Sequence, residues 1–126
     1  MTMKLLVAVD GSPEAEKAVR YALQFAKDSG ASITVLHVIT SSVAQKESEK
    51  VLARVRDIAK EIGIECNTKS YVNSVISRGI IDEAERGDFD QIIMGSRGLT
   101  GLKRVLLGSV ADSVTHYAHC PVTIVR

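Results

Sequence analysis

The chain has 126 residues, of which 45% are hydrophobic, and its 16 Lys and Arg residues against 15 Asp and Glu residues give a net charge of +1. This length is enough for a sizeable core without a disulfide or metal, so we predict a single domain over residues 1–126. The near-neutral charge provides no global field that would favour nucleic acid or an anionic membrane as a partner, so we expect neither, and any anion site must be local.

The cysteines and the first residues bear on the compartment. Cys66 and Cys120 are too few for a four-ligand metal cage, and we interpret them as reduced, buried thiols. The chain reaches Asp10 after only five consecutive apolar residues, which is too short for the core of a signal peptide. No uncharged apolar run approaches the length needed to span a membrane. We therefore expect a soluble cytoplasmic protein.

A strand and a helix are predicted first. The continuous apolar run Lys4–Val9 is typical of a strand covered on both faces. Ser12 is a suitable N-cap with Pro13 at the first helical position, and Gly30 is a natural stop. Small apolar residues recur at helical spacing between these signals, at Ala15, Ala18, Val19, Ala22 and Ala26.

The pattern then repeats. Ile33–Ile39 predicts a second strand, and a polar stretch leads to a helix that ends at Gly63. The apolar face of this helix consists of Val51, Val55, Ile58 and Ile62. Residues 64–72 show a strict alternation, which is typical of an edge strand. One set is Ile64, Cys66, Thr68, Ser70 and Val72, and the other is Glu65, Asn67, Lys69 and Tyr71.

The last third contains two helices and two strands. A helix with Ile76, Ile80 and Ala84 on one face is expected to end near Gly87, although Gly79 inside it is unfavourable for helix formation. A strand follows at residues 91–94. After a glycine-rich stretch we expect a short helix at residues 110–117 and a final strand at residues 121–126, which Pro121 can begin.

This alternation predicts an α/β fold: a three-layer α/β/α sandwich with a five-stranded parallel sheet. An edge position for the third strand suits the order 3-2-1-4-5. In that order the sheet reverses between strands one and four, and open parallel sheets bind ligands at the carboxyl ends of strands at such a reversal. The loops that begin at Asp10 and Gly95 flank this point.

The stretch from Gly95 to Ser109 fits a phosphate site. Gly95 and Gly98 can turn successive backbone amides toward one concavity, and Gly108 and Ser109 open a helix whose first amides favour an anion. The Ser109 hydroxyl can donate to a phosphate oxygen. Three cations lie within reach, at Arg97, Lys103 and Arg104. The stretch therefore suits a polyphosphate.

Two other interpretations stay open beside this one. Ser109 and Asp112 have the spacing of a capping box, which would satisfy the helix without a ligand, and exposed Lys and Arg are often merely solvated. Other phosphate motifs do not match: there is no G-x-x-x-x-G-K-[ST] and no G-x-G-x-x-G after the first strand. A Walker-type NTPase and a dinucleotide oxidoreductase are therefore poor interpretations.

The segments "LLVAVDGSPEAEKAVRYAL", "ITVLHVI", "DQIIMGSRG" and "LLGSVADSVTHYAHCPVTIVR" resemble the universal stress protein family over the whole chain. The motif G-x2-G-x9-G-[ST], matched at Gly95, Gly98, Gly108 and Ser109, is that of its ATP-binding branch. The resemblance implies an adenine nucleotide alpha hydrolase-like fold. The chain departs from the family after the third strand, where "VNSVIS" replaces a common glycine or Asp-Pro turn.

The resemblance also implies where a nucleotide binds. It places adenine at Val38, the ribose near Ala8 to Asp10, and the phosphates along Gly95 to Gly101 and on Ser109 to Ala111. Asp10 suits a ribose hydroxyl or a Mg²⁺-bound water, and equally helix capping beside Ser12. The nucleotide-binding residues predicted in this way are Ala8, Val9, Asp10, Val38, Met94, Gly95, Ser96, Arg97, Gly98, Leu99, Thr100, Gly101, Gly108, Ser109, Val110 and Ala111.

Binding with little or slow hydrolysis is the expected activity, as in a nucleotide-dependent sensor or switch of the stress response. Asp112 is the only acidic residue that the sequence places near the glycine loop, and hydrolysis needs a group that positions water. We expect the three histidines, His37, His116 and His119, to be satisfied by packing. The expected ligand is ATP, ADP or AMP.

Two alternatives remain. A phospho-accepting receiver domain would need Asp after the third strand and Lys after the fifth, where this chain has Val72-Asn73 and its last residue. An interaction module with a vestigial nucleotide pocket is the other. We also expect a homodimer through Val122–Val125, because an apolar edge strand invites pairing with a second copy, a mode that the family uses.

Overall fold

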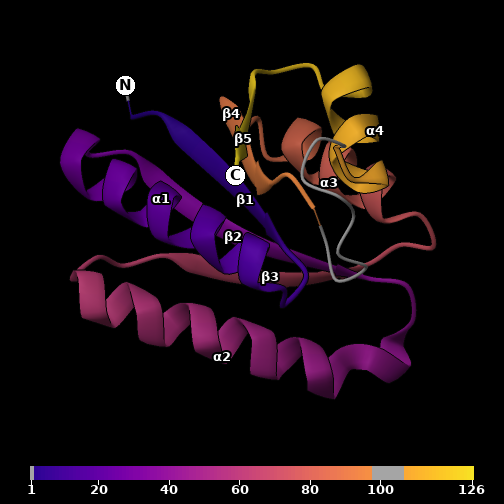
Figure 1. The fold of residues 1–126 in the computed structure, drawn as a ribbon, viewed down its shortest axis with the longest axis horizontal. Coiled ribbons are helices and arrows are strands. Elements are labelled where there is room, and N and C mark those ends of the chain that lie inside the picture. The colour runs from indigo at the N-terminus through magenta and orange to yellow at the C-terminus, as the bar shows by residue number, and fades with distance from the viewer. Residues whose placement is uncertain (1, 98–106) are drawn as a thin grey trace.

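The computed structural model describes residues 2–97 and 107–126. Five strands form one parallel sheet in the order β3-β2-β1-β4-β5, as the sequence predicted (Figure 1). Their bounds are β1 Lys4–Val9, β2 Ser32–Ile39, β3 Asn67–Val72, β4 Gln91–Gly95 and β5 Val122–Val125. The three central strands carry the apolar runs, because strands buried on both faces must be apolar along their whole length.

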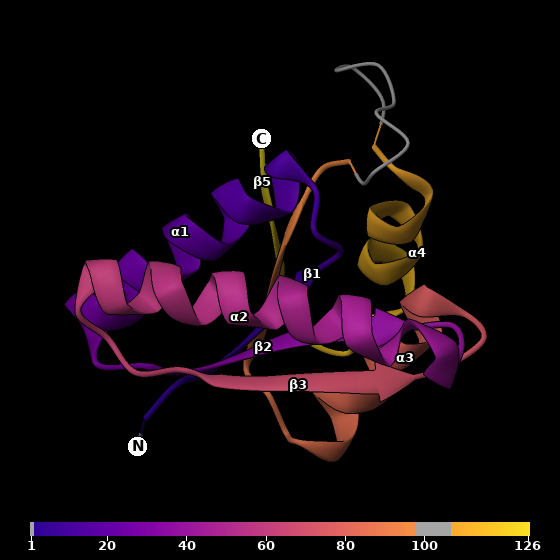
Figure 2. The same cartoon turned by 90° about the horizontal axis from the view of Figure 1, so that it is seen from below.

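Helices cover both faces of the sheet (Figure 2). Their bounds are α1 Pro13–Ser29, α2 Gln45–Ile62, α3 Ile76–Arg86 and α4 Ser109–Tyr117. One core cluster lies between the sheet and α1 with α2, and a second lies between the sheet and α3 with α4. This is the predicted three-layer sandwich. Among the described residues, no helix has both the length and the apolar character that crossing a lipid bilayer requires.

The first helix begins and ends where the sequence predicted. The Ser12 hydroxyl accepts a hydrogen bond from the Ala15 amide at 3.1 Å, and Pro13 occupies the first turn. Gly30 ends the helix with φ of +77°, a left-handed conformation that favours glycine. This well-defined start fixes α1 relative to the end of β1.

One predicted boundary differs by more than one residue, and the structure defines the start of α2, for which no residue was predicted. Helix α2 begins at Gln45, after a 3-10 turn at Ser42–Ala44, and its first turns are polar and lack a side-chain cap. Strand β3 begins at Asn67 and not at Ile64, since its pairing with β2 starts where Asn67 meets Thr34. The residues just before β3 pack against the core instead of joining the sheet.

Two glycines permit close approach between elements. A Cβ atom on Gly79 in α3 would lie 2.7 Å from the Val38 Cγ1 atom, so glycine lets α3 sit tightly against the end of β2. A Cβ atom on Gly95, the last residue of β4, would lie 2.9 Å from the carbonyl oxygen of Glu14. The first turn of α1 therefore packs directly on the end of β4.

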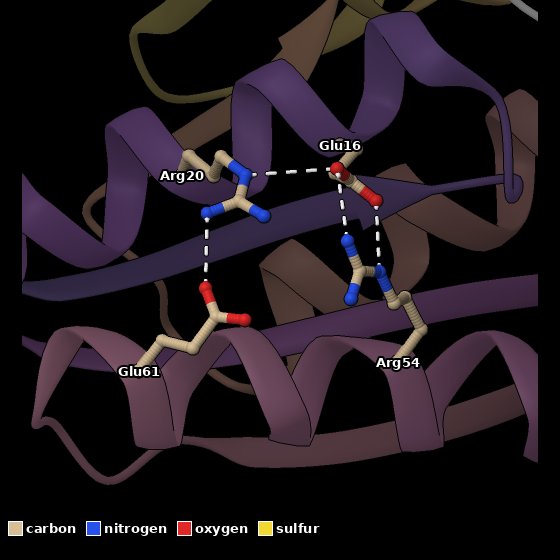
Figure 3. A network of polar contacts seen from close by, with 4 residues as sticks. All are labelled: Glu16, Arg20, Arg54 and Glu61. Atoms are coloured by element: carbon tan, nitrogen blue, oxygen red, sulfur yellow. Dashed lines mark hydrogen bonds and ion pairs between the residues drawn. The ribbon is translucent and has the colours of Figure 1, made fainter.

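A network of charged side chains joins the outer surfaces of α1 and α2 (Figure 3). The Arg54 Nε atom donates to Glu16 Oε1 at 3.1 Å, and the Arg20 Nε atom lies 3.6 Å from Glu16 Oε2. Arg20 also reaches Glu61 at 3.5 Å. The hydrogen bond from Arg54 is the main cause that lowers the pKa of Glu16 below its ordinary value. Glu16 is therefore held toward α2.

Candidate functional site: a cavity at the carboxyl ends of β1 and β4

A cavity of about 260 Å³ opens at the carboxyl ends of β1 and β4. Strand β1 pairs with β2 on one side and with β4 on the other, so this is the point where the sheet reverses. Beyond the strands, the cavity borders the beginnings of α1, α3 and α4. The lining residues are Ala8, Val9, Asp10, Ala15, Ile76, Ile80, Met94, Gly95, Ser96, Arg97, Gly108, Ser109, Val110 and Ala111.

Most of the predicted binding residues in the described part of the chain line this cavity. Val38 does not: it is buried in the core beneath Gly79, because α3 lies over the end of β2 at that point. The predicted residues Gly98, Leu99, Thr100 and Gly101 lie outside the described residues, as do the cations Lys103 and Arg104. The structure therefore brings together the residues at the ends of β1 and β4 with those at the start of α4.

The start of α4 lines the cavity with residues 108–111. Gly108 is the N-cap residue, and its own amide donates to the Ser96 carbonyl at 2.7 Å, which ties α4 to the end of β4. Ser109 is the first helical residue, and among the described residues no side chain caps this end. The capping box predicted for Ser109 and Asp112 is therefore wrong, because Ser109 lies one position inside the helix. Uncapped first-turn amides and the helix dipole favour an anion at this end.

Asp10 forms the turn between β1 and α1. Its Oδ1 atom accepts a hydrogen bond from the Ser12 amide at 2.9 Å, and Gly11 adopts φ of +85°. Both roles predicted for Asp10 are compatible with this geometry, since the residue lines the cavity and also supports the helix start. Among residues 2–97 and 107–126, no group of three or more His, Cys, Asp or Glu side chains could hold a metal.

Arg97 at the end of β4 has an acidic neighbour that the sequence analysis missed. The Arg97 Nη2 atom donates to Glu14 Oε1 at 3.0 Å, and both side chains are largely buried. Asp112 is therefore not the only acidic residue near the glycine loop. Arg97 and Glu14 are 83 positions apart in the sequence, so no local pattern could have predicted their contact.

The described apolar wall was predicted only in part. Ile76 and Ile80 line the cavity from α3, although the sequence analysis assigned them to the core face of that helix. Ala15 contributes from α1. Ile76 and Ile80 were recognised by their helical spacing. That spacing predicts a buried face of the helix but does not distinguish a core from a pocket wall.

The prediction that packing satisfies all three histidines is wrong for His116 and His119, because both are exposed. The His37 Nδ1 atom lies 2.8 Å from the hydroxyl of buried Ser48, and burial lowers the pKa of His37, with Asp10 opposing this change. The His116 Nδ1 atom lies 2.9 Å from the Asp112 carbonyl oxygen on the exposed side of α4. Neither histidine lines the cavity.

The two cysteines form no disulfide. Burial is the main cause that raises the pKa of the Cys66 and Cys120 thiols, so both are protonated and weakly nucleophilic at neutral pH.

Comparison with known proteins links this arrangement to one family. The model of the universal stress protein family matches residues 1–126. The universal stress protein YxiE of Bacillus subtilis is 34% identical over an alignment of 149 positions, which covers 100% of both chains.

Two solved structures are informative about ligands. The crystal structure of a universal stress protein in complex with cAMP has a TM-score of 0.83 and 25% identity, covering 99% of this chain and 97% of that one. The universal stress protein of Archaeoglobus fulgidus in complex with dAMP has a TM-score of 0.79 and 25% identity, covering 98% of each chain. Both of these similar proteins thus bind an adenine nucleotide.

Proposed function

The chain belongs to the universal stress protein family, and we propose that within this family it binds an adenine nucleotide in the cavity between β1 and β4. The observation that carries the proposal is the junction of the β4 end with the start of α4, where a helix start that no described side chain caps borders a cavity lined by Gly95 and Gly108. The complexes of similar proteins with cAMP and dAMP support it.

In this proposal the base and ribose occupy the part of the cavity between β1 and α3. Ile76 and Ile80 provide an apolar wall there, and Asp10 is positioned to accept a hydrogen bond from a ribose hydroxyl or to hold a Mg²⁺-bound water. The phosphates lie against Gly95, Arg97 and the first turn of α4, where amides and a cation can offset their charge. The ligand is ATP, ADP or AMP.

We propose that the site binds nucleotide as a sensor or switch with slow hydrolysis. In this proposal Asp10 supports the ribose or a Mg²⁺-bound water, and Glu14 is held by Arg97 outside the cavity wall, so neither carboxylate is assigned to deprotonate an attacking water. Phosphate release from ATP should be far slower than the roughly 1 s⁻¹ at the lower end of typical enzyme turnover. Turnover at or above that rate would contradict this part of the proposal.

Of the two alternatives, the receiver domain is excluded by the topology. Doubly wound receiver-like sheets have the order 2-1-3-4-5, whereas this sheet has β3 at the edge beside β2. The interaction module with a vestigial pocket makes a different prediction from ours, because it predicts no stabilisation by nucleotide.

Calorimetric titration with AMP, cAMP and ATP tests the proposal. Ser109→Ala should weaken binding about tenfold, because a hydrogen bond to a charged group contributes roughly 1.5 kcal/mol. Its thermal stability should stay unchanged, because Ser109 caps no helix. Ser32→Ala is a matched control, since Ser32 is exposed at the opposite end of the sheet. Absence of binding to the unmodified protein would refute the proposal.

We further propose a cytoplasmic homodimer formed through β5, without nucleic acid or membrane as partners. Strand β5 is an edge strand whose four residues are all partly exposed. The Pro121 carbonyl accepts a hydrogen bond from Ile92 in β4, and the Val125 carbonyl accepts one from Ser96 just after β4. By alternation the backbone N–H groups of Val122 and Ile124 point away from the sheet. Ile124→Pro should therefore block pairing, and sedimentation should change from dimer to monomer. A monomeric unmodified protein at micromolar concentration would contradict the proposal.

A further inference from the structure

The phosphate end of the cavity contains an internal ion pair that a ligand must meet. Glu14 lies in the first turn of α1, and Arg97 follows β4. The Glu14 side chain is 17% exposed and the Arg97 side chain 25%, so both charges are partly removed from water. Arg97 lines the cavity, whereas Glu14 lies outside its wall. The pair therefore holds the guanidinium toward α1.

A phosphate could replace Glu14 as the partner of Arg97, because the two side chains share a single hydrogen bond. One nitrogen of Arg97 reaches one oxygen of Glu14 at 3.0 Å, while the buried Glu14 Oε2 atom has no hydrogen-bond partner in the described part of the chain. Lys17 approaches the same Oε1 atom at 3.7 Å. A phosphate can instead engage a guanidinium through two parallel hydrogen bonds, which is the stronger arrangement.

The charge balance gives Glu14 a second effect. Arg97 is the only cation among the described residues that line the cavity, and the same lining includes the carboxylate of Asp10. Glu14 therefore neutralises the one cation on the described wall and places a further negative charge behind it. Repulsion from that charge increases with each negative charge on the ligand.

We propose that Glu14 is a specificity-determining residue: by holding Arg97 and repelling added phosphate charge, it makes the site favour nucleotides of low phosphate charge. This inference rests on the proposed nucleotide binding and adds a preference among nucleotides. Glu14 acts through Arg97 and need not touch the ligand, so it is a positioning residue. Its removal should strengthen binding, and the gain should grow from cAMP to AMP to ATP.

Glu14→Gln keeps the shape of the side chain and removes its charge. We take the Glu14 carboxylate to lie roughly 10 Å from the ligand phosphates, with an effective dielectric of about 20 and physiological salt. Removing its charge then raises the affinity about twofold per unit of negative charge on the ligand. We therefore expect a gain of about twofold for cAMP, about fourfold for AMP and roughly tenfold or more for ATP. Calorimetric titration without divalent cations measures all three, and higher salt should reduce the gains.

Two further variants separate this effect from a general one. Glu16→Gln removes the same charge from the same turn of α1, but Glu16 faces Arg54 and Arg20 on the side of α2, so the three affinities should stay unchanged (Figure 3). In an Arg97→Met background, Glu14→Gln should give a smaller gain than in the unmodified protein, because part of the effect passes through Arg97. Thermal unfolding of each variant reports whether it folds.

The outcomes are distinct. Binding by the unmodified protein with unchanged or uniformly weaker binding by Glu14→Gln overturns this inference and leaves the proposed function standing. Equal gains for cAMP and ATP, or the same gains from Glu16→Gln, also overturn it. If the unmodified protein binds none of the three nucleotides, the proposed function fails and the inference fails with it.

Discussion

Adding one methyl group at the end of β4 should destabilise the fold measurably. In Gly95→Ala, the new Cβ atom would lie 2.9 Å from the Glu14 carbonyl oxygen and 3.1 Å from its carbonyl carbon. These are main-chain atoms of a helix start that the Ser12 cap and buried Ala15 hold in place, so no side chain can rotate to relieve the contact. Overpacking of this kind costs about 3 kcal/mol, the upper part of the usual range.

The net change is smaller, because alanine restricts the unfolded chain more than glycine and returns roughly 1 kcal/mol. We therefore expect a loss of about 2 kcal/mol in the free energy of unfolding. For a domain of 126 residues, the unfolding entropy corresponds to roughly 4 °C per kcal/mol, so Tm should fall by about 8 °C.

Circular dichroism during thermal and urea unfolding measures the change, because the chain contains no Trp. Gly79→Ala is a suitable comparison, because its Cβ atom meets the side-chain methyl groups of Val38 and alanine is favoured by about 1 kcal/mol inside a helix. Its loss of stability should be smaller than that of Gly95→Ala. A Tm decrease below about 2 °C for Gly95→Ala would refute the argument that the start of α1 is fixed against β4.

Two other predictions concern charged groups. Burial lowers the pKa of His37 below 6.5 in the folded protein, so the unfolded chain binds a proton more readily than the folded one. The free energy of unfolding should therefore be highest above pH 6.5. It should decrease as the pH falls from 6.5 to the pKa of His37 in the folded protein. His37→Gln should weaken this decrease in urea unfolding across that pH range, and an unaltered profile would contradict the assignment. Glu83 is 7% exposed and accepts hydrogen bonds from Lys69 at 2.9 and 3.0 Å and from Arg86 at 2.9 Å. Because both cations remain partly solvated, Glu83→Ala should cost about 1–2 kcal/mol in urea unfolding, and a neutral result would show that the cluster is not stabilising.

The strands and their order were predictable because burial constrains the whole length of a strand. Strands β1, β2 and β4 are buried on both faces, and this produces the apolar runs in the sequence. The alternation that precedes and includes β3 correctly placed that strand at an edge. No start could be predicted for α2 for a related reason: its first turns are polar and leave no apolar spacing.

The candidate site was predictable where it follows the ends of elements. The turn after β1 and the glycines after β4 could be assigned to one edge of the sheet, because the carboxyl ends of parallel strands lie together. The position of Val38 could not be predicted in this way, since it depends on how closely α3 approaches β2 at Gly79. The sequence identifies Gly79 only as a poor helix former, and the packing reason for it is nonlocal.

The electrostatics of the site could be predicted least. Counting charges near the glycine loop in the sequence gives three cations and one carboxylate, Asp112, and this balance favours any polyphosphate. The structure adds Glu14, which reaches Arg97 because α1 packs on the end of β4, where Gly95 has no side chain to keep the helix away. The same close contact that makes Gly95→Ala costly therefore also brings the opposing charge to Arg97. If this is correct, Gly95→Ala should shift the nucleotide preference in the same direction as Glu14→Gln, since displacing α1 also weakens the ion pair.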